Sequence, residues 1–228
     1  MVTLTDLVCA YGDKRVLDIP SFTFAEDGVH GIVGLNGAGK TTLFNALYGF
    51  GRSKGAQVLY NGTDLSRHNA AFLEAENFFH PGITGREYLD LFSGGNKHFD
   101  LGGMNSLLQV PLDELITSYS TGMRRKLALF GVLKLDRPVV LLDEPMNGLD
   151  LAAVRVLEAI VRKLAEQGRT VFISSHMLAP LKALCGQIHL VQGGSIRRTY
   201  TPGEMDALEQ ALFADLDAHT DATIARSM

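Results

Sequence analysis

Residues 34–41 read Gly-Leu-Asn-Gly-Ala-Gly-Lys-Thr, with glycines at the first and sixth positions followed by Lys40 and Thr41. Glycines let a backbone curl so that successive N–H groups point inward at phosphates, and the helix that follows adds its positive N-terminal end. The Lys40 amine can reach the β- and γ-phosphates, and the Thr41 hydroxyl can ligate Mg²⁺. An apolar run precedes the loop and helix-forming residues follow it, which favours a binding loop over a plain turn. The residues expected to contact the nucleotide here are Gly34, Asn36, Gly37, Ala38, Gly39, Lys40, Thr41 and Thr42.

Two acids follow a second apolar run, residues 139–142. A buried strand there would carry Asp143 to the edge of a sheet, where its carboxylate can hold Mg²⁺ through water. Glu144 precedes Pro145, which biases it away from helical conformation and keeps its carboxylate at the end of the strand. That carboxylate can orient or deprotonate an attacking water. The pair predicts the catalytic half of a phosphate-binding site, with Asp143 and Thr41 as metal ligands.

His176 follows a third apolar run, residues 170–175. A neutral imidazole at that strand end can donate to the γ-phosphate and respond to its loss, so His176 is a catalytic candidate with Glu144 and Lys40. Ser175 and His176 also suggest a nucleophile with its base. Neighbours on a strand point to opposite faces, so we reject that interpretation.

The elements that position these residues form an α/β pattern. Short apolar runs separated by helical stretches indicate buried parallel strands, and residues 151–166 have helical periodicity with Gly168 as a stop. Residues 1–30, 55–65 and 186–199 alternate or are rich in turns, as in antiparallel strands, with a hairpin turn at Asn61-Gly62 and another at Gly193-Gly194. Residues 85–136 look mostly helical, with an interruption at residues 93–96, and residues 203–228 predict a helical tail.

Composition narrows the functional classes. The chain has 228 residues and a formal net charge of −4, which gives no general attraction to nucleic acid or anionic lipid. Charged residues and Pro138 break the longest apolar stretch, residues 127–142, so we expect no direct membrane insertion. Cys9 and Cys185 form no metal-ligand pattern and are interpreted as reduced core thiols of a cytoplasmic protein.

Residues 119–123, Tyr-Ser-Thr-Gly-Met, precede a helix about twenty residues before the acidic pair, and residues 147–150 read Asn-Gly-Leu-Asp. With the phosphate loop, these segments resemble the ATP-binding subunits of ABC transporters over nearly the whole chain. The resemblance implies one ATP-binding domain over residues 1–228: a P-loop NTPase core with a mostly parallel sheet, a small antiparallel β-subdomain, a short helical subdomain at about 85–136 and the C-terminal tail. It implies that Ser120 and Gly122 close over the ATP of a second subunit. It also places Asp150 at that interface, Tyr11 against adenine and His176 as the switch histidine.

Three family positions differ: within the signature segment, Thr121 replaces the first glycine and Met123 the glutamine. The glutamine that the family normally has between the phosphate loop and the signature segment is replaced by Ala75, flanked by Glu74 and Glu76. Three alternatives are open, namely Glu74 as a metal ligand, Glu76 as a metal ligand, or neither; Glu76 is retained as the candidate. Phe78, Phe79 and His80 either receive the coupling helix of a permease or pack in the core. The short span from Lys40 to Ser120 resembles single-domain subunits that pair with separate permeases, often exporters.

The resemblance implies ATP binding and hydrolysis with Mg²⁺, powering transport through a separately encoded membrane permease. The partners would be that permease and a second ATPase subunit, identical or related, with the chain peripheral on the inner face of the cell membrane. Two alternatives stay open: a soluble ABC ATPase acting on ribosomes or DNA, and a nucleotide-responsive module with weak catalysis. The basic triplet of residues 124–126 is expected to face solvent.

Overall fold

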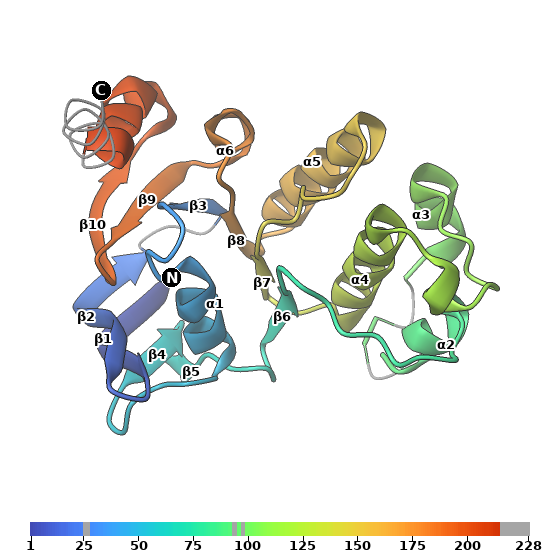
Figure 1. The fold of residues 1–228 in the computed structure, drawn as a ribbon, viewed down its shortest axis with the longest axis horizontal. Coiled ribbons are helices and arrows are strands. Elements are labelled where there is room, and N and C mark those ends of the chain that lie inside the picture. The colour runs from blue at the N-terminus through green and yellow to red at the C-terminus, as the bar shows by residue number, and fades with distance from the viewer. Residues whose placement is uncertain (25–27, 93–94, 97–98, 215–228) are drawn as a thin grey trace, which may run out of the picture.

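A six-stranded sheet forms the centre of the computed structural model, which describes residues 1–228 except 25–27, 93–94, 97–98 and 215–228. Its strands, in spatial order, are β10 (Ser195–Tyr200), β9 (Gln187–Gln192), β3 (Val29–Val33), β8 (Thr170–Ser174), β7 (Val139–Leu142) and β6 (Ala70–Leu73). All neighbours are parallel except β10, which pairs antiparallel with β9 at one edge (Figure 1). The predicted α/β fold with a mostly parallel sheet is therefore confirmed.

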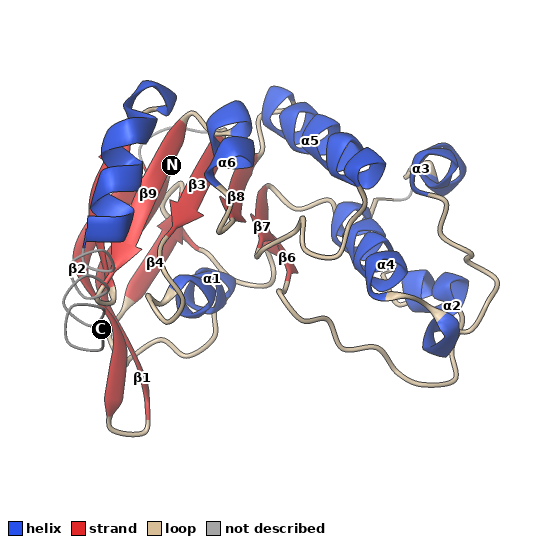
Figure 2. Cartoon of the chain, turned by 45° about the horizontal axis from the view of Figure 1, so that its top comes forward, coloured by secondary structure: helices blue, strands red, loops and turns tan. Residues whose placement is uncertain are grey.

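A smaller antiparallel sheet stands beside the first. It contains β2 (Lys14–Phe24), β1 (Val2–Tyr11), β4 (Gln57–Tyr60) and β5 (Thr63–Asp64), in that order. The β4–β5 turn is Asn61-Gly62, with φ of 48° and 80°, the left-handed pair that a two-residue hairpin requires. Helix α1 (Lys40–Tyr48) packs its buried face, which includes Leu43 and Phe44, into the apolar core shared with this sheet (Figure 2).

The predicted helical segment lies beyond β6, away from the small sheet (Figure 1). It holds α2 (Gly85–Asp90), α3 (Leu101–Leu108), a 3₁₀ turn at Ile116–Ser118 and α4 (Thr121–Leu135). Of the predicted interruption, residues 93 and 94 lie outside the described residues. Gly95 is described, and a Cβ there would lie 1.9 Å from the Lys134 carbonyl oxygen, so close backbone contact requires glycine.

Two further helices pack on the face of the large sheet opposite α1. Helix α5 (Leu151–Glu166) confirms the predicted periodicity, and Gly168, at φ 76°, ends it as expected. Helix α6 (Leu178–Leu184) joins β8 to β9. Residues 205–214 are helical, and the rest of the predicted tail lies outside the described residues. Cys9 and Cys185 are buried free thiols, and none of the described helices is long and apolar enough to cross a membrane.

Two buried histidines share one hydrogen bond inside the core. His30 Nδ1 lies 3.1 Å from His189 Nε2, and His189 Nδ1 lies 2.9 Å from the Thr199 hydroxyl. The rings of Phe22 and Phe24 pack edge-on against His189. Burial first, and His30 second, lower the pKa of His189 from its ordinary 6.5 to about 3. The core therefore holds His189 in its neutral form, because its ring is removed from water and faces a second imidazole.

Acid should therefore destabilise this core. Between pH 3 and 6.5 the unfolded chain binds a proton at His189 that the folded chain does not, so the free energy of unfolding falls as pH falls. From pH 7 to pH 5 we expect a loss on the order of 1–2 kcal/mol at this residue. Urea unfolding at both pH values measures it. A His189→Gln variant should show a smaller loss, whereas exposed His68→Gln should behave as wild type; equal losses in all three chains would contradict the assignment.

Candidate active site

The glycine-rich loop joins β3 to α1, and two of its glycines are required by close contacts. A Cβ on Gly34 would lie 2.3 Å from the Val191 carbonyl oxygen, and one on Gly39 would lie 2.8 Å from Leu17 Cδ2. Gly39 also has φ 106°, a conformation that L side chains rarely adopt. The loop wraps back on the amine of Lys40, which donates to the Gly34 carbonyl at 2.7 Å. The loop therefore already encloses the positively charged amine of Lys40.

Asp143 lies at the carboxyl end of β7 and is almost fully buried. Its Oδ2 accepts from the Thr41 hydroxyl at 2.7 Å, and its Oδ1 accepts from the Ser174 hydroxyl at 2.5 Å. Ser174 Oγ in turn accepts from the Glu144 N–H at 2.8 Å. The structure therefore brings Thr41 and Asp143 together, as the sequence predicted. The linking role of Ser174 was not predicted, since a serine ending an apolar strand carries no distinctive pattern.

Glu144 has a backbone φ of 46°, unusual for a residue with a side chain. Its Oε2 lies 2.9 Å from His176 Nδ1 and also accepts from the His176 N–H at 3.3 Å. Ser175 takes no part in this pair; its hydroxyl accepts from the Met177 N–H at 3.0 Å. The geometry agrees with the rejection of a serine–histidine nucleophile and places the two catalytic candidates, Glu144 and His176, in direct contact.

A cavity of about 240 Å³ opens between the loop and the acids. Its lining residues are Val16, Asn36, Gly37, Gly39, Lys40, Thr41, Thr42, Asp143 and Glu144. Within the described ranges, no group of three or more histidine, cysteine, aspartate or glutamate side chains is placed to hold a metal ion. Mg²⁺ suits this site, because it is commonly held by one or two protein oxygens together with substrate phosphates and water. The Thr41 hydroxyl and the Asp143 carboxylate provide those oxygens.

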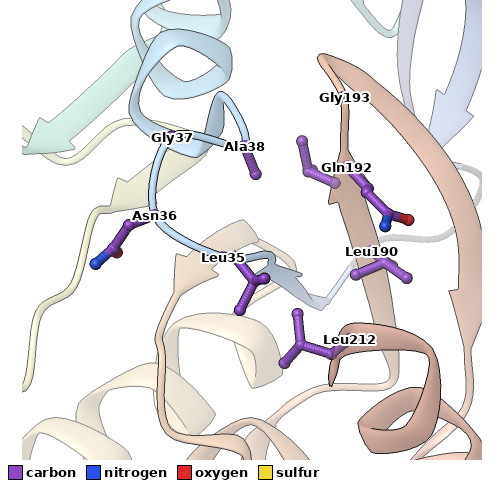
Figure 3. A pocket seen from close by; sticks show the side chains of 9 residues that line it. Leu35, Asn36, Gly37, Ala38, Leu190, Gln192, Gly193 and Leu212 are labelled. Carbon is purple, nitrogen blue, oxygen red and sulfur yellow. The ribbon is translucent and has the colours of Figure 1, made fainter. Parts of the chain in front are cut away.

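A second cavity, of about 230 Å³, lies on another side of the loop (Figure 3). Leu35 and Leu212, the latter from the C-terminal helix, face each other across it, beside Leu190 (Figure 3). Its lining holds no charged side chain. A nucleoside triphosphate with its metal needs cationic and carboxylate groups, which line the cavity that contains Lys40 and Asp143 and are missing from the lining of the second cavity.

The predicted signature segment begins α4. Ser120 is the N-cap, and its hydroxyl accepts from the Met123 N–H at 3.2 Å. A Cβ on Gly122 would lie 2.6 Å from the Gly148 carbonyl oxygen, so glycine lets this helix start pack against the segment after the acidic pair. Asp150 caps α5 and pairs with Lys126 at 3.1 Å. The hydrogen bond from Ala153, and then the bond to Lys126, lower the pKa of Asp150.

Two other predicted residues lie apart from these contacts. Tyr11 ends β1 at the tip of the β1–β2 hairpin and is 62% exposed, which leaves its ring free for a flat ligand. Glu76 is exposed and lines a different cavity, with Ala75, Asn147 and Gly148. The structure does not bring Glu76 to Thr41 and Asp143, and its role as a metal ligand stays a prediction.

The basic triplet agrees with the sequence interpretation only at Arg124, which is exposed. Arg125 is 5% exposed, and the Lys126 side chain, which pairs with Asp150, is 16% exposed. The triplet lies on the first turns of α4, and residue 125 is on the side of that helix that meets the segments following β6 and β7. The guanidinium donates to carbonyl oxygens of Glu74, Ala75, Asp143, Glu144 and Pro145. Burial lowers its pKa to about 10, so it remains a cation at neutral pH.

Comparison with known proteins identifies a family pattern in the same region. The family model described as "ABC transporter" matches residues 17–147, which include the loop and the acidic pair. The chain is 30% identical to the ABC transporter ATP-binding protein YhcH of Bacillus subtilis over 80% of its own length and 64% of that protein. It is 30% identical to the cobalt import ATP-binding protein CbiO of Salmonella paratyphi A, over 93% of its own length and 85% of CbiO.

The fold has a close structural counterpart. A solved structure described as the ATP binding subunit of an ABC transporter superposes with a TM-score of 0.82 and covers 98% of this chain and 99% of its own. The two sequences are 22% identical, so this likeness speaks for the fold. The chain spans less than two thirds of the length of YhcH.

Proposed function

Because this chain belongs to the ATP-binding subunits of ABC transporters, which are ATPases, we propose that its ATP hydrolysis powers transport through a separate membrane permease. The observation that carries the proposal is the hydrogen bond from the Thr41 hydroxyl to the Asp143 carboxylate, next to the phosphate loop. It joins the phosphate-binding and acidic halves of the site in one cavity. The chain then acts as a peripheral subunit on the inner face of the membrane.

The chemistry follows from the positions of the side chains. Lys40 neutralises charge on the β- and γ-phosphates, while Thr41 and Asp143 would hold Mg²⁺, which would stabilise the negative charge on the phosphates. Glu144 orients the attacking water and accepts its proton, and the contact with His176 holds the carboxylate in place. Tyr11 stacks on the adenine ring.

The second half of each site comes from another subunit in this proposal. Ser120 and Gly122 lie at the exposed start of α4, where free N–H groups and the helix dipole favour an anion. A second copy, or a related ATPase subunit, would place this helix start over the ATP held by Lys40. A lone subunit should therefore hydrolyse ATP slowly.

The surface proposed for the permease is a cavity of about 260 Å³ after β6. It is lined by Asn77, Phe78, Phe79, His80, Pro81, Ile116, Thr117 and Arg124. Phe78 is 77% exposed, whereas the Phe79 ring lies 5.0 Å from that of Tyr88 and packs against the core. The sequence left two roles open for these residues, core packing and contact with a permease. Phe79 packs in the core, and we assign contact with the permease to Phe78.

Capture from membranes tests this function. The tagged chain should recover a multi-spanning membrane protein in stoichiometric amount from gently solubilised membranes of its native cell. Phe78→Asp should lower that recovery about tenfold, because a buried carboxylate replaces an apolar contact. Leu107→Asp, an exposed position on α3 outside this cavity, should leave the recovery unchanged. A clean soluble dimer, or a chain bound to ribosomes, would contradict the proposal.

The direction of transport, import or export, depends on the permease that the chain serves. The short span from Lys40 to Ser120 resembles subunits that often serve exporters, whereas the relative CbiO is named for cobalt import. Export stays the prediction for this chain, because import is stated only of that relative. The captured permease decides it, since vesicles containing the complex would accumulate substrate or release it.

A further inference from the structure

The buried guanidinium of Arg125 lies between two loops that follow neighbouring strands of the large sheet. One loop follows β6 and begins with Glu74 and Ala75; the other follows β7 and holds Asp143 and Glu144. Arg125 Nη1 donates to carbonyl oxygens of the first loop, at 3.1 Å to Ala75, and Nη2 to those of the second, at 2.8 Å to Glu144. One planar group therefore clamps both loops.

Burial of this cation carries a desolvation cost. Its hydrogen-bond acceptors are carbonyl oxygens, and the carboxylates of Asp143 and Glu144, which bond to other partners, attract its charge without contacting it. An apolar side chain in the same space would avoid the desolvation cost but would leave those carbonyl oxygens without this donor. The fork of a guanidinium adds a fixed geometry that an apolar side chain lacks, because its donors set the angle between the two loops.

Arg125 contacts a residue, Glu144, whose backbone conformation is strained. Glu144 holds φ 46° immediately before Pro145, a conformation that persists only when its surroundings enforce it. Arg125 holds the Glu144 carbonyl, Ser174 holds its N–H and His176 holds its carboxylate. Removing the bond to the carbonyl should let the carboxylate turn away from its catalytic direction.

The other end of the clamp leads to the molecular surface. Asn77 Nδ2 donates at 3.1 Å to the Glu74 carbonyl, the same oxygen that Arg125 contacts. Phe78, 77% exposed, is the next residue. A displacement of this loop therefore moves an acceptor of Arg125 directly.

We propose that Arg125 is a positioning residue that sets the direction of the Glu144 carboxylate and makes it depend on the loop of residues 74–80. The inference rests on the proposed function only in identifying what docks on Phe78. ATP turnover by the purified chain tests the clamp without any permease, so its failure and the failure of the transport proposal are distinguishable.

The test is a comparison of Arg125→Lys with wild type in steady-state ATP turnover. Lysine keeps the charge and loses the fork, so kcat should fall about tenfold while KM for ATP stays within about twofold. Arg155→Lys, an exposed residue of α5, is the matched control and should change neither. A lower Tm with unchanged kcat would show a structural role and overturn the proposal, as would a fall in kcat matched by a rise in KM.

The link to the surface loop has its own variant. Asn77→Ala should lower kcat about threefold in the wild-type background and have no further effect in Arg125→Lys, because both act through one carbonyl. Additive effects would overturn the link. If Arg125→Lys fails to fold, Asn77→Ala alone decides: an unchanged kcat overturns the proposal, and a lower kcat with unchanged KM supports it.

Discussion

A Glu144→Gln chain is expected to bind ATP and Mg²⁺, to accumulate as an ATP-bound dimer, and to turn over ATP at least about 100-fold more slowly than wild type. Glutamine keeps the oxygen that accepts from His176 but cannot take a proton from water. The phosphate loop and its cation are untouched, so affinity for ATP should be preserved. Binding would then proceed while the step that releases the second subunit stalls.

Light scattering with size-exclusion chromatography measures this outcome. With ATP and Mg²⁺, the variant should elute at twice the mass of the chain, and without ATP at the mass of one chain. Glu166→Gln, an exposed residue at the end of α5, is the matched control and should behave as wild type. A single-chain mass for Glu144→Gln in ATP and Mg²⁺ would count against the two-subunit site.

Lys40→Met should abolish useful ATP binding. Charge-assisted hydrogen bonds from the amine to the phosphates contribute about 3 kcal/mol, so the Kd for ATP should rise about 100-fold. In the structure the same amine donates to the Gly34 carbonyl, and methionine fills its volume without that bond. We therefore expect a small change in Tm and a large change in affinity.

Titration of a fluorescent ATP analogue in the presence of Mg²⁺ measures that affinity. Lys54→Met replaces an exposed lysine outside the loop and should leave the Kd unchanged. An equal Kd for Lys40→Met and wild type would contradict the assignment of phosphate binding to the loop of residues 34–41.

The phosphate loop, the acidic pair and His176 were predictable because each is encoded within a few adjacent residues. A strand followed by glycines or acids places its end residues at one edge of a parallel sheet, whatever the rest of the chain does. The hairpin at Gly193-Gly194 was predictable for the same reason. Its place in the large sheet was not, since pairing of β9 with β3 joins segments more than 150 residues apart.

The contacts of Arg125 and Ser174 could not be predicted from local sequence patterns. Three consecutive basic residues on a helix usually face solvent, and only the packing of α4 against the segments that follow β6 and β7 buries the middle one. Its acceptors lie 18 to 51 residues away in sequence. Such contacts depend on tertiary packing, which no short window of sequence contains. The same limit applies to Glu76, whose spacing suggested a metal ligand although its side chain lines another cavity.

The most direct measurement of the central claim is ATP turnover by the membrane complex recovered with this chain, compared between wild type and Glu144→Gln. If hydrolysis at this site powers the permease, the wild-type complex turns over ATP in the presence of Mg²⁺ at a rate at least about 100-fold above the variant. Equal and negligible rates in the two complexes would contradict the account and would identify the chain as a nucleotide-responsive module without catalysis.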